Sequence, residues 1–130
     1  MSRHETWRTR RYWESIGGLL IEEFTAINLD RANGTGKRLI DGIIVPDAER
    51  RIQTGGTYDF RSKDIIVVQT KKTRLGMYLM GQAFFSRELM RRFEPSSIRT
   101  VAICGAGDPQ MEALCSQFDI EVVVIYDAEE

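Results

Sequence analysis

A single run of apolar residues constrains the fold of this chain more than any other feature. Residues 64–71 read DIIVVQTK, with four β-branched apolar residues in an unbroken row. Such a run is typical of a strand that is covered on both faces. We therefore expect this segment to form the centre of a sheet with helices on both sides.

The remaining hydrophobic pattern predicts the elements around this strand. Helices are expected over residues 7–27 and 75–93 and after Asp108, and strands over 38–45, 51–54, 57–60, 99–104 and 121–126. The predicted fold class is α/β, a three-layer fold with a central mixed β-sheet flanked by helices, in the order α-β-β-β-α-β-α-β.

Length and composition predict a single domain over residues 1–130. No segment approaches the roughly 20 apolar residues of a membrane helix, so no membrane partner is expected. No apolar stretch typical of a secretory signal follows the basic N-terminus, which favours a cytoplasmic location. Cys104 and Cys115 are expected to be buried, reduced thiols.

The net charge of −1 is the sum of two opposite regions. Residues 1–99 contain all 18 Lys and Arg residues and 12 acids, a charge of +6, whereas residues 100–130 carry −7. A charge distribution of this kind can attract a polyanion to one face. The alternative is that the arginines only solvate the surfaces of helices and strands.

Three polar residues interrupt or end the apolar strands. Asp41 lies within RLIDGIIV, and Gln69 and Lys71 lie at the end of IIVVQTK. An unpaired polar group costs roughly 1–3 kcal/mol to bury, so each of these residues requires a partner.

The register between the two strands decides whether these residues meet. Gly55-Gly56 predicts a hairpin turn that would place Asp41 opposite Thr70. In that register Asp41 points away from Gln69 and Lys71. We therefore expect one extra residue in the ribbon, as a bulge or a three-residue turn, most simply at Pro46-Asp47.

A carboxylate, an amide oxygen and a lysine at one sheet edge form a unit with recognisable chemistry. Mg²⁺ prefers oxygen ligands, and a lysine beside it can orient or activate water or offset charge on a phosphate. A second acid would come from the predicted first helix, which contains Glu14, Glu22 and Glu23.

Three segments resemble, in order, the motifs of the PD-(D/E)XK nuclease superfamily, closest to Mrr-type restriction endonucleases and archaeal-type Holliday junction resolvases. They are YWESIGGLL, LIDGIIV and VVQTK, and the resemblance covers residues 12–126. It implies a restriction-endonuclease-like fold and the catalytic set Glu14, Asp41, Gln69, Lys71 and Gln82. Glu14, Asp41 and Gln69 would then bind Mg²⁺, or Mn²⁺ in its place, with Glu22 as the alternative to Glu14.

This resemblance leads us to expect a metal-dependent DNA endonuclease of restriction, junction-resolving or repair type. Phosphate contacts are expected from Arg8, Arg10, Arg11, Lys37, Arg38, Lys72 and Arg74. A homodimer or a partner subunit would supply specificity, because 130 residues leave little room for a separate reading module. The alternatives are a non-catalytic DNA-binding or assembly subunit on the same fold and a nuclease acting on RNA.

Overall fold

A computed structural model describes residues 3–127 of the chain, and the side chains from residue 6 onward. Its elements, in chain order, are α1 (Arg3–Ile16), β1 (Leu19–Ile27), β2 (Arg38–Val45), β3 (Arg51–Thr54), β4 (Asp64–Thr70), α2 (Met77–Met90), the 3-10 helix η1 (Arg91–Phe93), β5 (Ser97–Cys104), α3 (Pro109–Gln117) and β6 (Ile120–Val124).

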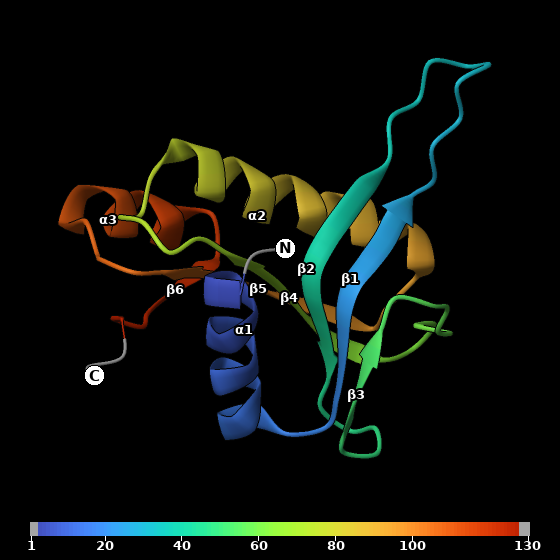
Figure 1. The fold of residues 1–130 in the computed structure, drawn as a ribbon, viewed down its shortest axis with the longest axis horizontal. Coiled ribbons are helices and arrows are strands. Elements are labelled where there is room, and N and C mark those ends of the chain that lie inside the picture. The colour runs from blue at the N-terminus through green and yellow to red at the C-terminus, as the bar shows by residue number, and fades with distance from the viewer. Residues whose placement is uncertain (1–2, 128–130) are drawn as a thin grey trace.

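The strands form one mixed sheet in the order β3-β1-β2-β4-β5-β6 (Figure 1). β2 is antiparallel to β1 and to β4, whereas β4, β5 and β6 are parallel. The helices α2 and α3 make the two crossovers between these parallel strands. As expected, β4 is an interior strand, and its residues 65–70 are all buried.

Helices cover both faces of the sheet, so the predicted α/β class with a flanked mixed sheet is confirmed. On one face, Tyr12 and Trp13 of α1 pack against Leu20, Ile44 and Val68. On the other face, the buried side of α2 and α3 packs over the sheet in two further clusters. Both cysteines lie buried there as free thiols, as expected.

The prediction of one helix over residues 7–27 is wrong. The helix ends at Ile16, and after Gly17 and Gly18 the chain continues as strand β1. Both glycines have positive φ, and a Cβ at Gly18 would lie 2.3 Å from the carbonyl oxygen of Val45. The glycine pair therefore turns the chain sharply onto the sheet, and the element order gains one strand before β2.

The hairpin predicted at Gly55-Gly56 is also wrong. β3 pairs with β1 in parallel at the sheet edge, and residues 57–60 form no strand. The expected one-residue change in register is nevertheless present. Gly42 pairs with Val68, so extending the ladder by one position places Asp41 opposite Gln69 rather than Thr70. The connection over residues 46–63 sets this register, and no bulge at Pro46-Asp47 is needed.

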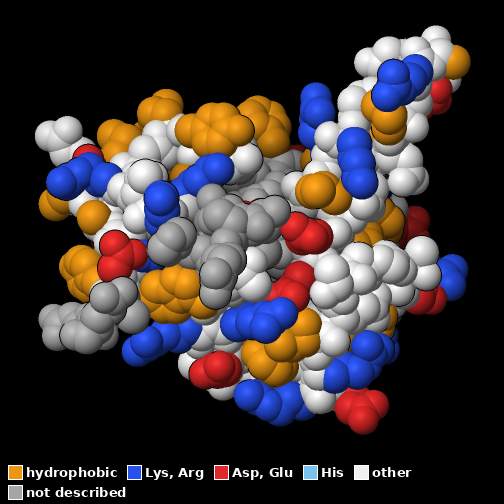
Figure 2. Space-filling view, viewed as in Figure 1, with side chains coloured by type: hydrophobic (Ala, Val, Ile, Leu, Met, Phe, Trp, Pro, Cys, Tyr) orange, Lys and Arg blue, Asp and Glu red, His pale blue; other side chains and the backbone are white. Residues whose placement is uncertain are grey.

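The connection between β1 and β2, residues 28–37, forms an arm that extends away from the rest of the molecule (Figure 1). Asp30 and Thr35 pair across it through reciprocal backbone hydrogen bonds of 2.9 Å. Lys and Arg side chains are prominent along the arm and its base (Figure 2). Within residues 3–127, no helix is both long and apolar enough to cross a membrane.

Candidate functional site

Asp41 joins strands β2 and β4 at the position where the sequence predicts the site. Its Oδ2 accepts a hydrogen bond of 2.9 Å from the backbone N–H of Thr70, and its own N–H donates to Oε1 of Gln69 at 3.4 Å. At the end of the ladder, the half-buried carboxylate of Asp41 therefore takes the place of a backbone carbonyl as the acceptor for the Thr70 N–H. This arrangement confirms the expected proximity of Asp41 and Gln69.

The side chain of Gln69 is fixed from the side of α2. Its Nε2 donates a hydrogen bond of 2.7 Å to Oγ of Ser86, and both residues are buried. Gln82, one turn earlier on α2, lines the same surface groove as Gln69 and Ser86. Its amide oxygen is buried and has no hydrogen-bond partner among the described residues. Gln82 and Gln69 therefore face the same groove.

On the opposite face of the sheet, α1 contacts the same strand end. The hydroxyl groups of Thr9 and Thr70 form a buried hydrogen bond of 2.8 Å. Arg10 donates from Nε and Nη2 to the two carboxylate oxygens of Glu22, at 2.8 and 2.9 Å. The Glu22 side chain is only 5% exposed. A bidentate pair of this kind fixes both charge and orientation, so Arg10 anchors α1 to β1.

Strand β1 carries two acids, Glu22 and Glu23, beside the Asp41 end of β2. Glu22 pairs with Gly42, and Phe24 pairs with Ile40, so Glu23 is the residue opposite Asp41. Glu23 has a positive φ of 52°. This backbone region costs a non-glycine residue roughly 1–3 kcal/mol, and such strain often occurs at functional sites.

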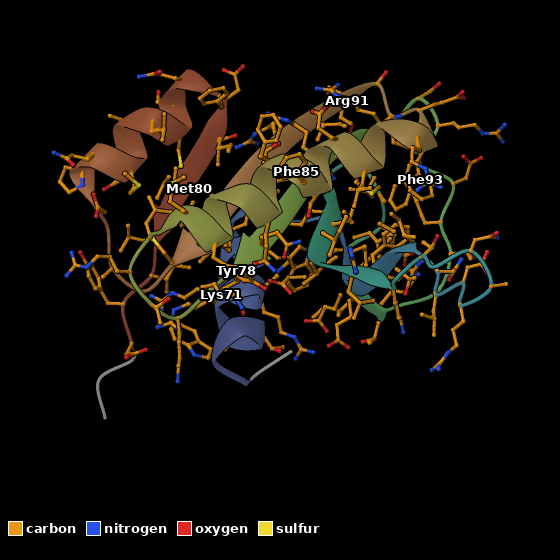
Figure 3. The ribbon with its side chains drawn as sticks, turned by 90° about the horizontal axis from the view of Figure 1, so that it is seen from above. Lys71, Tyr78, Met80, Phe85, Arg91 and Phe93 are labelled. Atoms are coloured by element: carbon orange, nitrogen blue, oxygen red, sulfur yellow. The ribbon has the colours of Figure 1, made fainter. Side chains whose placement is uncertain are left out.

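Lys71 follows directly after β4 and is held by its backbone. Its N–H donates to the carbonyl of Ile103 at 2.9 Å, and its Nζ lies 5.2 Å from the centre of the Tyr78 ring. Figure 3 shows the two side chains next to each other at the start of α2. A Cβ at Gly105 would lie 1.9 Å from the carbonyl oxygen of Lys72. Only a glycine lets the segment after Lys71 pack this closely against β5.

The structure does not bring Glu14 to this site. Glu14 is exposed on α1, whereas Thr9, Tyr12 and Trp13 form the helix face that contacts the sheet. In the ladder, Glu23 of β1 lies opposite Asp41, whereas Glu22 is turned toward Arg10 on the α1 side of the sheet, away from the Gln69 side chain. No group of three or more His, Cys, Asp or Glu side chains in the described part of the chain is arranged to hold a metal ion.

The basic residues expected to contact phosphates divide into three groups. The expected phosphate contact of Arg8 is wrong. Its side chain is fully buried, donates to the carbonyl of Ile125 at 2.8 Å and forms an ion pair with Asp127. Arg10 is engaged by Glu22, which raises the pKa of the guanidinium through hydrogen bonding and charge. The exposed group comprises Arg11, Lys37, Arg38, Lys72 and Arg74.

The sequence did not indicate the roles of three residues around the site: Thr9 and Ser86 were not assigned, and Arg10 was expected to contact phosphate. Thr9 and Arg10 fasten α1 to the sheet next to Asp41, and Ser86 orients Gln69. Ser86 carries a recognisable signal, since it is a polar residue on the buried face of α2. Arg10 carries no such signal, because its partner Glu22 lies on β1, which is absent from the predicted elements, and the partner of Thr9, Thr70, is far away in sequence.

Comparison with known proteins adds no family to this description: the chain matches no family model, no curated protein and no solved structure. The functional assignment therefore depends on the geometry around Asp41.

Proposed function

We propose that this protein is a metal-dependent DNA endonuclease that hydrolyses phosphodiester bonds at Asp41, Gln69 and Lys71. The observation that carries the proposal is the contact between the second and third motif residues. Asp41 and Gln69 share a hydrogen bond across the ladder, and Lys71 follows Gln69 by two positions. The resemblance to PD-(D/E)XK nucleases assigns roles to these same three residues.

The donor atoms at this site fit a hard divalent cation. The carboxylate of Asp41 and the amide oxygen of Gln69 are oxygen ligands of the kind that Mg²⁺ or Mn²⁺ accepts, and β1 places Glu23 opposite Asp41 in the ladder. When bound, the ion would stabilise charge on the scissile phosphate and lower the pKa of a water molecule.

The residues of the chain have separate tasks in this proposal. Asp41 and Gln69 would bind the metal ion. Ser86 keeps the Gln69 amide oxygen directed toward Asp41. Lys71 orients the attacking water or offsets the negative charge that develops on the phosphate. Arg11, Lys37, Arg38, Lys72 and Arg74 supply exposed cations for the DNA backbone, which predicts salt-sensitive binding.

The test is cleavage of supercoiled and single-stranded DNA with Mg²⁺, with Mn²⁺ and with EDTA. We expect metal-dependent cleavage that falls at least about 100-fold in Lys71→Ala and Asp41→Asn. Lys63→Ala and Asp64→Asn are matched controls, because both residues are exposed at the opposite end of β4. Equal cleavage by Lys71→Ala and Lys63→Ala would refute the assignment.

The same assay tests which acid accompanies Asp41 at the site. Glu23→Gln is expected to impair cleavage because Glu23 lies opposite Asp41, whereas Glu14→Gln is expected to have no effect because Glu14 is exposed away from the sheet.

A second candidate function is a non-catalytic DNA-binding or assembly subunit. This function is favoured because polar atoms around the site already have partners within the protein. Both ends of the Gln69 amide are hydrogen-bonded, and Arg10 binds both oxygens of Glu22. Wild-type protein that binds DNA but cleaves none of the substrates would favour this candidate over the endonuclease.

A further inference from the structure

A groove of about 810 Å³ runs between α2 and the base of the arm, next to the candidate site. Its walls carry large apolar side chains that are mostly in contact with solvent. Met77, Tyr78 and Phe85 of α2 are 68%, 71% and 65% exposed, and Leu39 of β2 lies across from them at 47%. Figure 2 shows hydrophobic side chains gathered along the edge that α2 forms, and Figure 3 shows Tyr78 and Phe85 on this helix.

The fold does not require these side chains to be apolar. The opposite side of α2, with Leu79, Met80 and Ala83, already packs against the sheet. Contiguous exposed apolar residues on a soluble domain generally mark a binding surface. The exposed stripe on α2 is therefore available for a ligand or partner.

The charges around the groove favour a polyanion. Arg38 and Arg92 line it, and neither forms an ion pair with any side chain that the structure describes. Glu88, the one acid among the described residues that line the groove, is bound by Arg91 at 3.1 Å and contacts Arg87. The uncompensated positive charge of Arg38 and Arg92 suits an anionic ligand better than a second copy of the same basic surface.

Aromatic rings beside unpaired cations are the combination that binds single-stranded nucleic acid. Bases stack on the rings while the cations contact the phosphates. In a duplex, the faces of the bases are covered by their neighbours and cannot stack on protein side chains. The groove also includes Gln69 and Ser86, so a strand lying in it would reach the candidate site.

We propose that this groove binds an unpaired segment of DNA, with bases on Tyr78 and Phe85 and phosphates on Arg38 and Arg92. The inference deepens the proposed endonuclease function, on which it rests for its biological meaning, by naming the substrate class as DNA that contains single-stranded regions. Binding itself requires no metal and no cleavage.

The test is fluorescence anisotropy with labelled oligothymidine of about 15 nucleotides and with a duplex of the same length, both in EDTA. We expect wild type to bind the single strand more tightly, and Tyr78→Ala and Phe85→Ala to weaken that binding roughly tenfold each. Tyr78→Phe should retain it. Tyr126→Ala is the matched control, because Tyr126 is also 71% exposed but does not line the groove.

Two results would overturn the inference. One is equal affinity of wild type for the single strand and the duplex. The other is unchanged single-strand binding in Tyr78→Ala and Phe85→Ala. If Phe85→Ala also converts a wild-type dimer into monomers, the exposed stripe on α2 is a contact between two copies of the chain instead. Arg92→Gln gives an independent readout, since loss of a phosphate contact reduces the dependence of binding on salt.

Failure of the proposed function gives a different pattern. If no DNA is cleaved in any metal but oligothymidine still binds and depends on Phe85, the endonuclease proposal fails and the groove assignment stands. Asp41→Asn separates the two further, because it is expected to abolish cleavage while leaving single-strand binding intact.

Discussion

The bidentate pair between Arg10 and Glu22 makes a sharp prediction about stability. The pair joins α1 to β1 beside the candidate site, and the Glu22 side chain is 5% exposed while that of Arg10 is 47% exposed. Removing one partner of a buried pair costs about 3–5 kcal/mol, because the other charge stays buried without compensation. Water reaches the Arg10 side of this pair, so we expect Arg10→Gln to lower the free energy of unfolding by about 2 kcal/mol.

The pair between Arg99 and Glu121 provides a matched control. Its geometry is the same, with two hydrogen bonds of 2.9 and 2.8 Å, but its side chains are 52% and 48% exposed. Surface pairs contribute about 0–1 kcal/mol, so Arg99→Gln should cost less than about 1 kcal/mol. The difference between the two variants isolates the effect of burial.

The assay is urea unfolding in EDTA, followed by the fluorescence of the buried Trp13. Glu22→Gln and the double variant complete a thermodynamic cycle, and we expect the double variant to lose less than the sum of the single variants. If Arg10→Gln costs no more than Arg99→Gln, burial of the Glu22 charge is not what makes this contact important, and the reasoning fails.

Three further predictions concern the fold and its titrating groups. Gly18→Ala should lower the free energy of unfolding by about 3 kcal/mol, because the added Cβ clashes with Val45 and the residue has a positive φ. Gly81→Ala, in open space on α2, should raise the free energy of unfolding by about 0.5–1 kcal/mol, and urea unfolding measures both variants. Hydrogen bonds from Arg61 lower the pKa of Asp59 to about 2, so its stabilising ionisation persists at neutral pH and is lost between about pH 4 and 2, and NMR titration should show this midpoint move upward in Arg61→Gln. Burial raises the pKa of both cysteine thiols, so a disulfide reagent at pH 8 should react with them only after unfolding, and rapid labelling of the native protein would contradict their burial.

The strand β4 could be predicted from sequence because one local property determines it. Its unbroken apolar run fits only a position covered on both faces, and residues 65–70 are buried as expected. Likewise, Asp108 caps α3 by accepting hydrogen bonds from the N–H groups of Gln110 and Met111, as its position before Pro109 indicates.

The first helix could not be delimited in this way, because its apolar residues fit two periods at once. Leu19, Leu20, Phe24 and Ile27 continue the spacing of a helix, yet they belong to a strand that bends at Glu23. The deciding information is the close approach of Gly18 to Val45, which is a tertiary contact. Consequently, the sequence alone could predict that Asp41 and Gln69 lie close together but not that residues 19–27 form the strand beside Asp41.

The register between β2 and β4 depends on chain connectivity rather than on local turn signals. Gly55 and Gly56 have positive φ and do form a turn, but that turn ends β3 at the sheet edge, where Gly55 donates to the carbonyl of Glu22 at 2.7 Å. The glycine pair therefore gave the right local conformation and the wrong partner strand.

The most direct test of the proposed site is a crystal structure of the protein with Mn²⁺, using anomalous scattering to locate the ion. The account predicts a peak about 2.2 Å from a carboxylate oxygen of Asp41 and from Oε1 of Gln69, with Glu23 as a further ligand. It also predicts that this peak disappears in Asp41→Asn. Protein that cleaves DNA with Mn²⁺ but binds the ion only elsewhere, or binds none at Asp41, would contradict the account.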